Sequence, residues 1–442
     1  MIIKMKKALF LGSILFFFSF CNAQQREQKK YNILIIESDD QSNQAVGAFG
    51  NPSIQTPSID LLAEDGTSFT SAYNMGCWAP AVCVPSRTML LYGKYLWKSQ
   101  KITKKNAPES FPETLKNNGY STYMTGKWHA YGNEAKDVFE QTGTITEGQL
   151  KTYNTDKGHI TDITAKEAVD YIKSYKDDKP FLVYVAFNAP HVPRQTEKKY
   201  YDLYPSENII LPPSVIDGDS LNTNIKYQYT RNPLRAKTMK NRVQQNNAMV
   251  THMDERIGNI ISTLKEKGIY DDTIIVFMSD HGISFGENGV AGKVCVYEPS
   301  VTAPLIIKAP KMIANKKIKN RVYLQDVFPT LLDMLAIQSP ENIDFKSLSP
   351  IVEENKDTRT SIYLAMFYDQ RAIIKDNKKL ILFPETSDLE LYDLEKDPWE
   401  TTNLKNQKNA IPIIKNLMKD FKNWQLKTKD TLDISKEFKK YL

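Results

Sequence analysis

Cysteine is scarce in this chain, with four residues, Cys21, Cys77, Cys83 and Cys295, among 442. So few thiols exclude a fold built on disulfide bonds. Dense blocks of Lys or Arg are also absent, and 58 basic against 52 acidic residues leave a net charge of only +6. This composition gives no reason to expect a nucleic-acid partner, although a mild positive excess fits a polyanionic substrate. After residue 20 no run is apolar enough to predict a membrane span.

Residues 1–23 have the pattern of a secretory signal peptide. Three lysines precede an apolar stretch over residues 8–20 that is too short to span a bilayer, and small residues lead to a predicted cleavage site after Ala23. Lipidation of Cys21 is the lesser alternative, because Ser19-Phe20 is a poor lipobox. We therefore predict an exported protein, periplasmic or extracellular, with attachment to the outer membrane as a lipoprotein as the alternative.

Four apolar runs are continuous rather than alternating, which is typical of strands covered on both faces in a parallel sheet. They span residues 33–36, 122–125, 181–187 and 274–278. Helical spacing lies between them, over residues 58–64, 160–176 and 242–267. Because strand and helix alternate, we predict an α/β fold whose large, mixed but mostly parallel sheet lies between helices.

The pattern changes near residue 350. Three short segments, 361–367, 371–374 and 379–383, are typical of antiparallel strands joined by turns, and a basic amphipathic helix follows over 411–426. We therefore predict a catalytic α/β domain over residues 24–350 and a smaller C-terminal α+β subdomain with an antiparallel sheet over residues 351–442.

The chemically distinctive residues follow the predicted strands. They are Asp39 and Asp40 after the first, Lys127 and His129 after the second, His191 after the third, and Asp280 and His281 after the fourth. Loops at the carboxyl ends of parallel strands converge on one crevice, so these groups are expected to meet. The three carboxylates would repel one another unless a cation neutralised them, which predicts a Ca²⁺ or Mg²⁺ site.

Cys83-Val84-Pro85-Ser86-Arg87 has a helix-starting proline, which places residue 83 at a helix N-terminus. Backbone N–H groups there favour an anion, and Arg87 lies one turn further on. A buried structural cysteine is the alternative for this pattern, because lone cysteines are commonly buried.

Five further motifs follow in order along the chain. They are Gly126-Lys127-Trp128-His129; His191-Val192-Pro193; Ser279-Asp280-His281-Gly282; Gly292-Lys293 with Tyr297-Glu298 and Pro304-Leu305; and Leu391-Tyr392-Asp393-Leu394 with Asp397-Pro398, Glu400 and Asn403-Leu404. Together with Cys83-x-Pro85-Ser86-Arg87 they resemble the signatures of type I sulfatases, a formylglycine-dependent family of the alkaline-phosphatase-like superfamily, and in particular of secreted bacterial glycan sulfatases. The resemblance runs from about Tyr31 to Leu404.

The resemblance implies a mechanism. A maturation enzyme would oxidise Cys83 to formylglycine (3-oxoalanine), and a hydroxyl of its hydrate would attack sulfur. The implied metal ligands are Asp39, Asp40, Asp280, His281 and the modified residue 83, with Ca²⁺ preferred and Mg²⁺ the alternative. Sulfate oxygens would be neutralised by Arg87, Lys127 and Lys293. Proton transfer would involve His191, with Lys293, as donor to the leaving oxygen and His129 as the base that lets sulfate leave.

The resemblance and the export signal together favour a sulfated polysaccharide or oligosaccharide as the substrate. A phosphate or phosphonate monoester hydrolase is the alternative, because relatives with that activity share the cysteine motif and the metal residues. A non-catalytic glycan-binding protein is a weaker alternative. Trp78, Trp128 and Tyr131 lie beside the motifs, where they would either stack on sugars or pack around the site. The polar stretch over 194–241 is expected to form part of the pocket wall.

A few residues remain open or depart from the family pattern. Cys77 and Cys295 are expected either to form a disulfide or to remain two buried thiols. No role is assigned to His159 or His252. Thr302 occupies a position where many relatives carry Arg, and Glu287-Asn288-Gly289 replaces a His-Gly of some relatives, so both segments are expected to alter the substrate rim.

Overall fold

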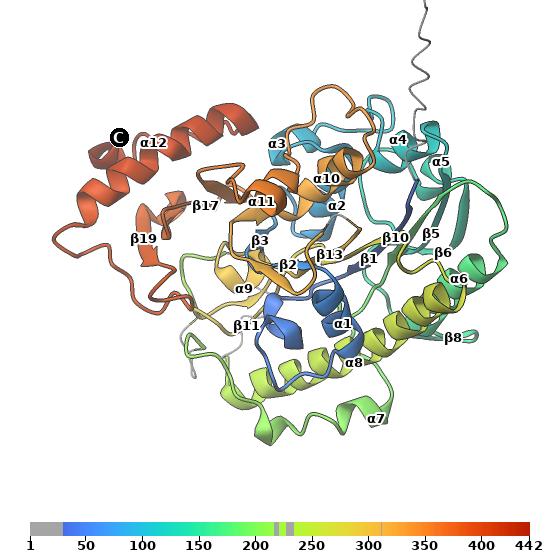
Figure 1. The fold of residues 1–442 in the computed structure, drawn as a ribbon. Helices are drawn as coiled ribbons and strands as arrows, with labels where there is room; N and C mark the ends of the chain where they lie inside the picture. Colours follow the sequence, from blue (N-terminus) through green and yellow to red (C-terminus); the bar gives the residue numbers. More distant parts are fainter. Residues whose placement is uncertain (1–29, 216–220, 227–233, 311) are drawn as a thin grey trace, which may run out of the picture. The chain divides into compact units, whose positions relative to one another are not determined.

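A computed structural model describes residues 30–215, 221–226, 234–310 and 312–442 (Figure 1). The predictions of a signal peptide and of lipidation at Cys21 lie outside these residues. Within them, the helices are all too short or too polar to cross a bilayer.

The core of the fold is an eight-stranded sheet with the strand order β14-β2-β13-β10-β1-β9-β5-β6. Its strands are β1 (Asn32–Ser38), β2 (Thr67–Phe69), β5 (Ser121–Lys127), β6 (Gln141–Thr146), β9 (Phe181–Ala186), β10 (Thr273–Ser279), β13 (Leu305–Lys308) and β14 (Lys316–Ile318). The four predicted apolar runs are the central strands β10, β1, β9 and β5, which pair in parallel. Only the pairs that involve β13 are antiparallel, so the predicted mixed, mostly parallel sheet is confirmed.

Helices cover both faces of this sheet, because alternate residues of the central strands point in opposite directions. Leu34 and Ile36 of β1 pack in one core with residues of α1 (Pro57–Asp65), α6 (Ile160–Ser174) and α8 (Ala236–Glu266). Ile33 and Ile35 pack in a second core with residues of α2 (Cys83–Tyr92), α4 (Phe111–Asn117) and α10 (Val327–Met334). The continuous apolar sequence of β1 is therefore explained by burial on both sides.

A second, five-stranded sheet has the order β19-β18-β17-β16-β4. It contains β16 (Ile362–Met366), β17 (Gln370–Lys375), β18 (Lys378–Phe383) and β19 (Asp388–Asp393), which are antiparallel, and α12 (Ala410–Thr428) packs in its core. The sequence analysis missed β19, because its charged residues hide the strand pattern. The boundary at residue 350 stays a prediction.

The fifth strand of this sheet, β4 (Gly76–Cys77), comes from the N-terminal part of the chain and pairs in parallel with β16. Gly76 is required there, because its φ is +123° and a side chain would begin 1.8 Å from the carbonyl oxygen of Ala365. The segment that leads to Cys83 is thus attached to the C-terminal sheet.

The remaining elements are short. The helices are α3 (Leu96–Ser99), α5 (Ala135–Val138), α7 (Lys198–Tyr201), α9 (Glu298–Val301) and α11 (Ser349–Glu354). The strands are β3 (Ala72–Tyr73), β7 (Asn154–Thr155), β8 (Gly158–His159), β11 (Ser284–Phe285), β12 (Ala291–Gly292) and β15 (Val322–Tyr323).

Candidate active site

The ends of the central strands bring the motif residues together. Ser38, the last residue of β1, pairs with Ser279, the last residue of β10. Asp39-Asp40 and Asp280-His281 therefore follow neighbouring strand ends, and the backbone N–H of Asp40 donates to Oδ1 of Asp280 at 3.3 Å. Lys127 ends β5 at the same edge. The topology of the sheet therefore brings these residues together at one edge, as the sequence led us to expect.

Helix α2 begins at Cys83, so the thiol lies at a helix N-terminus and its side chain is buried. The hydroxyl of Ser86 donates to the carbonyl oxygen of Asp280 at 2.5 Å, and Nε2 of Gln325 donates to Ser86 Oγ at 3.1 Å. These contacts join the first turn of α2 to the end of β10. Ser86 in the cysteine motif is therefore a structural link that fixes the position of residue 83.

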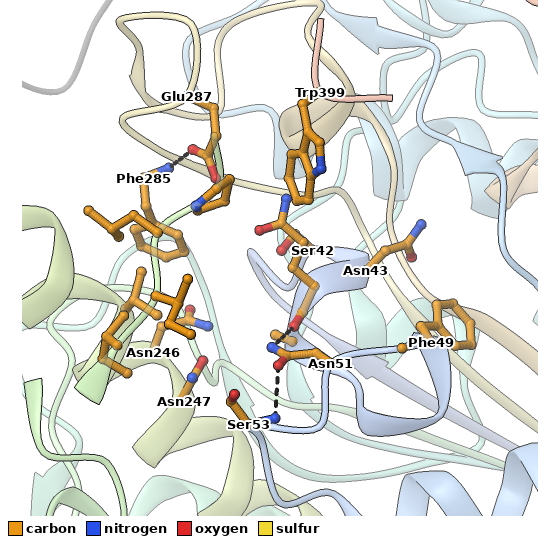
Figure 2. A pocket seen from close by; sticks show the side chains of 18 of the residues that line it. Ser42, Asn43, Phe49, Asn51, Ser53, Asn246, Asn247, Phe285, Glu287 and Trp399 are labelled. Carbon is orange, nitrogen blue, oxygen red and sulfur yellow. Dashed lines mark hydrogen bonds between the residues drawn. The ribbon is translucent and has the colours of Figure 1, made fainter. Parts of the chain in front are cut away.

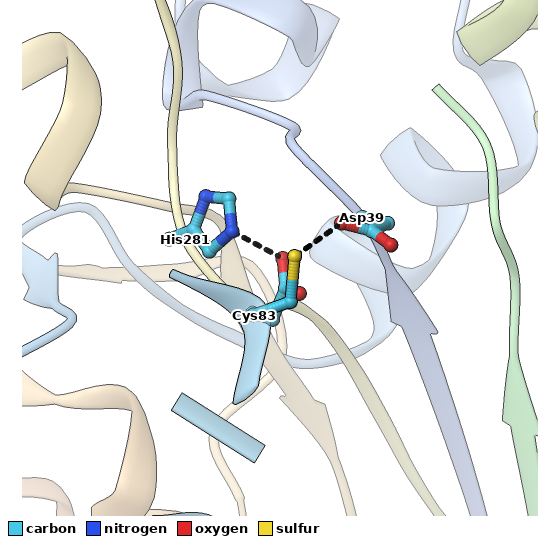
Figure 3. A group of neighbouring side chains, drawn as sticks. Asp39, Cys83 and His281 are labelled. Carbon is cyan, nitrogen blue, oxygen red and sulfur yellow. Dashed lines mark hydrogen bonds and ion pairs between the residues drawn. The ribbon is translucent and has the colours of Figure 1, made fainter. Parts of the chain in front are cut away.

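The thiol of Cys83 lies among charged side chains, of which Figure 3 shows Asp39 beside it and His281 on its other side. Its Sγ lies 3.2 Å from Nζ of Lys293, 3.6 Å from Nζ of Lys127 and 3.5 Å from Oδ1 of Asp39. Burial and the Asp39 carboxylate oppose ionisation, but the two ammonium groups and a hydrogen bond from His129 hold the pKa of the Cys83 thiol well below its ordinary value. The site therefore stabilises negative charge at residue 83.

Four side chains, that of Cys83 among them, offer donor atoms for a cation. Atoms of Asp39, Asp280, His281 and Cys83 all lie within 4.8 Å of one another, and Asp40, with Asp39, Cys83 and His191, forms an overlapping group. Nδ1 of His281 donates to the carbonyl oxygen of Gly282 at 2.8 Å, which turns Nε2 toward Asp40 Oδ1 at 3.4 Å. The donor atoms of these residues are of the kinds that bind divalent cations in proteins.

Two observations support that fit. Oδ2 of Asp40 and Nε2 of His281 are buried and have no hydrogen-bond partner among the described residues. Burial and the neighbouring Asp39 carboxylate also raise the pKa of Asp280 well above its ordinary value. Ionised carboxylates this close together are unfavourable, and a dication would relieve their repulsion.

Arg87 is buried and is held by acceptors on β1, on β5 and in the segment directly after β10. Its Nη1 donates to Oε2 of Glu37 at 2.7 Å and to the carbonyl oxygen of Lys127 at 3.2 Å, and its Nε donates to Oδ2 of Asp280 at 3.3 Å. Tyr184 donates a hydrogen bond to the same Glu37 oxygen. Burial raises the pKa of Glu37, although Arg87 opposes this. Sequence reasoning missed Glu37, because it lies inside an apolar strand and in no motif.

Two lysines bridge the carboxylates and the thiol. Nζ of Lys293 lies 2.6 Å from Oδ1 of Asp40, and Nζ of Lys127 forms an ion pair with Asp39. Both lysines are almost fully buried, so their charges are poorly screened by water. Together with Arg87, which binds Glu37 and Asp280, they place three positive charges among the carboxylates of the site.

The two predicted proton-transfer histidines border the site. His191 donates from Nδ1 to the carbonyl oxygen of Val192 at 2.8 Å, and its Nε2 lies 3.8 Å from Oδ2 of Asp40. Nδ1 of His129 is buried and has no hydrogen-bond partner among the described residues. Because Nδ1 of His191 already donates to a carbonyl, only a second proton on Nε2 lets this residue act as an acid toward the site.

Cys83, His129, His191 and Lys293 line a cavity of about 490 Å³, which we call the first pocket. Its wall also contains Arg194, Arg242 and Phe285. Of the stretch 194–241 expected to form the wall, only Arg194 contributes among the described residues. Trp78 and Trp128 are buried in the hydrophobic cores, and Tyr131 is 42% exposed, with its ring centroid 5.7 Å from that of Trp78. None of the three lines the pocket.

Cys77 and Cys295 are free, buried thiols. Sγ of Cys77 lies 3.3 Å from Sδ of Met366, and the thiol of Cys295 donates to Oγ of Ser300 at 2.9 Å. Burial raises their pKa values to about 12 and about 11. Of the two alternatives for these cysteines, the structure has the two thiols and not the disulfide.

Two histidines without a predicted role lie in a separate cluster. Nε2 of His252 is 2.9 Å from Oδ1 of Asp162, and its ring stacks on that of Tyr200. Nε2 of His159 donates to the carbonyl oxygen of Gln195 at 3.0 Å. Nε of Arg256 forms an ion pair with the same Asp162 carboxylate. These contacts are structural and do not involve the first pocket.

A buried ion cluster connects two of the C-terminal motifs. Nζ of Lys379, on β18, lies 2.8 Å from Oε1 of Glu298 and 2.7 Å from Oε1 of Glu400. The side chains of Lys379 and Glu400 are completely buried. Glu298 belongs to the Tyr297-Glu298 motif and Glu400 to the motif that follows Asp397-Pro398. The acidic residues of these motifs therefore hold the second sheet against α9 and lie outside the first pocket.

Comparison with known proteins agrees with this geometry. The sulfatase family model matches residues 31–337, and the model described as N-sulphoglucosamine sulphohydrolase, C-terminal, matches residues 286–427. A sulfatase of Formosa agariphila is 28% identical, with 89% of this chain and 87% of that protein covered. An N-acetylglucosamine-6-O-sulfatase of Bacteroides thetaiotaomicron is 26% identical, with 94% and 91% covered.

Among solved structures, one is described as a complex with its substrate D-glucosamine-2-N,6-O-disulfate. It has a TM-score of 0.78 and 23% sequence identity to this chain, and the match covers 92% of this chain and 100% of the other. This likeness supports the fold. The family model covers well over half of the sequence, so the predicted family is confirmed. The chain belongs to the sulfatase family, and it is a sulfuric ester hydrolase.

Proposed function

We propose that this sulfatase removes sulfate from a sulfated oligosaccharide or polysaccharide, with residue 83 as the nucleophile after oxidation of its thiol to formylglycine. The observation that carries the proposal is the position of Cys83, which lies at the start of α2 between two lysines and a carboxylate at the wall of the first pocket. The carbohydrate class rests on relatives such as the N-acetylglucosamine-6-O-sulfatase and on an ulvan-active sulfatase that is 28% identical.

Binding of the sulfate group is assigned to Arg87, Lys127 and Lys293. Charge in a sulfate ester is spread over its oxygens, so fixed cations stabilise both the bound ester and its transition state. The three cations are buried and anchored by carboxylates, which favours preorganised binding. Nε and Nη1 of Arg87 already bind protein acceptors, so its Nη2, which has no hydrogen-bond partner among the described residues, is the nitrogen left for a sulfate oxygen, whereas each lysine acts as a point charge.

The proposed cation ligands are Asp39, Asp40, Asp280 and His281, with residue 83 completing the set. A bound Ca²⁺, or alternatively Mg²⁺, would lower the pKa of a hydroxyl at residue 83 and orient the ester. Although burial opposes its charged form, the Asp280 carboxylate raises the pKa of His281 to about 9. Displacement of the proton on His281 by the cation is therefore part of binding, and affinity should increase with pH.

Proton transfer is assigned to His191 and His129. His191 lies at the pocket wall, and a proton on its Nε2 would be donated to the leaving alcohol. His129 is hydrogen-bonded to residue 83 and has an unpartnered Nδ1, so it is suited to remove a proton from that residue and release sulfate. A serine at position 83 lacks the second hydroxyl and would remain as a stable sulfate ester.

The biological setting in this proposal is the periplasm or the cell exterior. It rests on the signal-like N-terminus and on an extracellular sulfatase among the relatives. The proposal also requires a maturation enzyme that acts on Cys83. Attachment through a lipidated Cys21 is the lesser alternative.

The test uses matured protein and a panel of sulfated oligosaccharides from ulvan, carrageenan and heparan sulfate, with each desulfated product identified by mass and by position. Cys83→Ala is the inactive control. Release of sulfate from at least one glycan by the wild type but not by Cys83→Ala is expected. If no member of the panel loses sulfate while 4-nitrophenyl sulfate is hydrolysed, the carbohydrate assignment is wrong.

A phosphate or phosphonate monoester hydrolase is less supported, because both matching family models describe sulfatases. The rates on 4-nitrophenyl sulfate and 4-nitrophenyl phosphate separate the two activities. A higher kcat/KM on the phosphate ester would reverse the order of these assignments.

A further inference from the structure

A second cavity of about 440 Å³ lies beside the first pocket (Figure 2). Its wall is formed by the loop after β1, the loop around residues 209–213, the first half of α8, and Phe285 and Trp399. This volume is within the range of ordinary small-ligand sites. Figure 2 shows Asn246 and Asn247 of α8 projecting toward Ser42 and Asn51 of the first loop.

The lining of this second cavity is mainly apolar, with several amide and hydroxyl side chains and a single ionisable one among the described residues. Among the described residues that line it, none is Lys or Arg, so it lacks the cations of the first pocket. The single acidic side chain, Glu287, is buried and accepts hydrogen bonds from the hydroxyl of Ser284 and the backbone N–H of Phe285. Burial raises the pKa of Glu287. The second cavity therefore does not favour a sulfate or another anion.

Amide side chains provide its hydrogen-bonding capacity. Asn246 is only 2% exposed, and its Oδ1 has no hydrogen-bond partner among the described residues. A buried amide without a partner is costly, and a ligand hydroxyl would satisfy it. Asn247, 5% exposed, lies next to it on the same wall. Primary amides both donate and accept, which suits the hydroxyl groups of a sugar.

Aromatic rings of Phe49, Phe285 and Trp399 form part of the apolar wall, beside aliphatic side chains. Trp399 precedes Glu400, whose carboxylate binds Lys379 and the backbone N–H of Glu298. Nδ2 of Asn288 donates to the carbonyl oxygen of Glu400 at 2.8 Å and so joins Trp399 to the loop that carries Glu287. With its neighbour anchored in this way, Trp399 presents its indole to the cavity beside hydrogen-bonding groups, the combination that a sugar ring needs.

The two cavities are neighbours that share part of their walls. Phe285 lines both, and the neighbouring residues Arg242 and Val243 on α8 line the first pocket and the second cavity respectively. The guanidinium of Arg194 lies 5.2 Å from the centroid of the Phe285 ring on the side of the first pocket. A glycan bound by its sulfate in the first pocket would therefore reach the second cavity past Phe285.

We propose that the second cavity binds an uncharged sugar unit of the same glycan whose sulfate ester occupies the first pocket. This inference rests on the proposed function and extends it, because it makes the enzyme selective for oligosaccharides over sulfated monosaccharides. The sulfated unit is recognised by buried cations and the uncharged unit by amides and Trp399.

The experiment compares three substrates: 4-nitrophenyl sulfate, the sulfated monosaccharide, and the corresponding tetrasaccharide from whichever glycan of the panel is desulfated. The variants are Trp399→Ala and Asn247→Ala, and the matched control is Asn259→Ala, an exposed position on the same helix. We expect both variants to lose about fivefold to tenfold in kcat/KM on the tetrasaccharide, mainly through KM. Unchanged rates on 4-nitrophenyl sulfate show that the variants are folded and matured.

The control is expected to match the wild type on all three substrates. If Trp399→Ala and Asn247→Ala also keep the preference of the wild type for the tetrasaccharide, the inference is overturned while the proposed function remains. If no glycan is desulfated, both the inference and the proposed function fail. The desulfated tetrasaccharide should inhibit the wild type competitively; purely non-competitive inhibition would mean that the second cavity binds a separate glycan, which also overturns the inference.

Discussion

The buried ammonium of Lys379 is expected to be essential for the stability of the second sheet. In Lys379→Met the carboxylates of Glu298 and Glu400 lose the positive charge that lies 2.8 and 2.7 Å from them. Removal of one partner from a buried ion pair costs about 3–5 kcal/mol, because the remaining charge stays buried. We therefore expect Lys379→Met to lose about 3–5 kcal/mol of unfolding free energy at pH 8.

The loss of unfolding free energy in Lys379→Met should depend on pH, because Glu400 changes its protonation state. Burial raises the pKa of Glu400 from 4.5 to about 7, although Lys379 opposes this rise. A carboxyl whose pKa is higher in the folded state binds its proton more tightly there, so the wild type loses stability as the pH rises from about 4.5 to about 7. Without Lys379 the pKa of Glu400 should rise further. At pH 5 Glu400 is neutral in the variant, and the loss of unfolding free energy relative to the wild type should fall to about 2 kcal/mol.

The measurement is urea unfolding followed by tryptophan fluorescence at pH 5 and pH 8. Lys378→Met is the matched control, because Lys378 is the neighbouring residue on β18 and its side chain, 30% exposed, pairs with Asp393. A surface pair of this kind contributes about 1 kcal/mol or less. Equal losses in the two variants, or a loss in Lys379→Met that is the same at both pH values, would refute the reasoning.

Two further predictions concern the first pocket. Cys83→Ser, with its serine verified by mass spectrometry as unmodified, should bind the substrate but show no steady-state turnover; normal turnover by that variant would disprove the need for an aldehyde precursor. Excess Ca²⁺ should raise the melting temperature of the wild type, because a ligand at about 100 times its Kd adds about 2.7 kcal/mol. Asp280→Asn should abolish this shift, while Asp271→Asn, at a position 98% exposed, should retain it; a full shift in Asp280→Asn would exclude the proposed cation site.

Much of the fold follows from local sequence patterns. The central strands are continuous apolar runs because both faces of β1 are buried, and this pattern is visible without a structure. By contrast, β19 carries Asp388, Glu390 and Asp393 and has a mixed pattern, and the two-residue strand β4 is too short to give one. Both are strands because of their partners in the second sheet, and pairing between distant segments is not encoded locally.

In the candidate site, too, some residues could be predicted from the sequence and others could not. Residues such as Asp39 and Asp280 could be placed together from the sequence, because their strands are parallel neighbours and each residue directly follows a strand end. Glu37 could not, since a single acid at the end of an apolar run gives no indication of the arginine that it binds. The second cavity is also invisible in the sequence, because segments around residues 42–53, 209–213, 243–247 and 285–287, with Trp399, form its wall only after folding.

The pairing of β4 with β16 has a consequence for the order of events in the cell. The segment that holds Cys83 is anchored to a strand made almost 300 residues later in the chain, and its thiol is only 1% exposed once that anchor forms. During synthesis the N-terminal half emerges first, while its final anchor does not yet exist. An enzyme that modifies this thiol therefore has a limited time window, which closes when the last strands assemble.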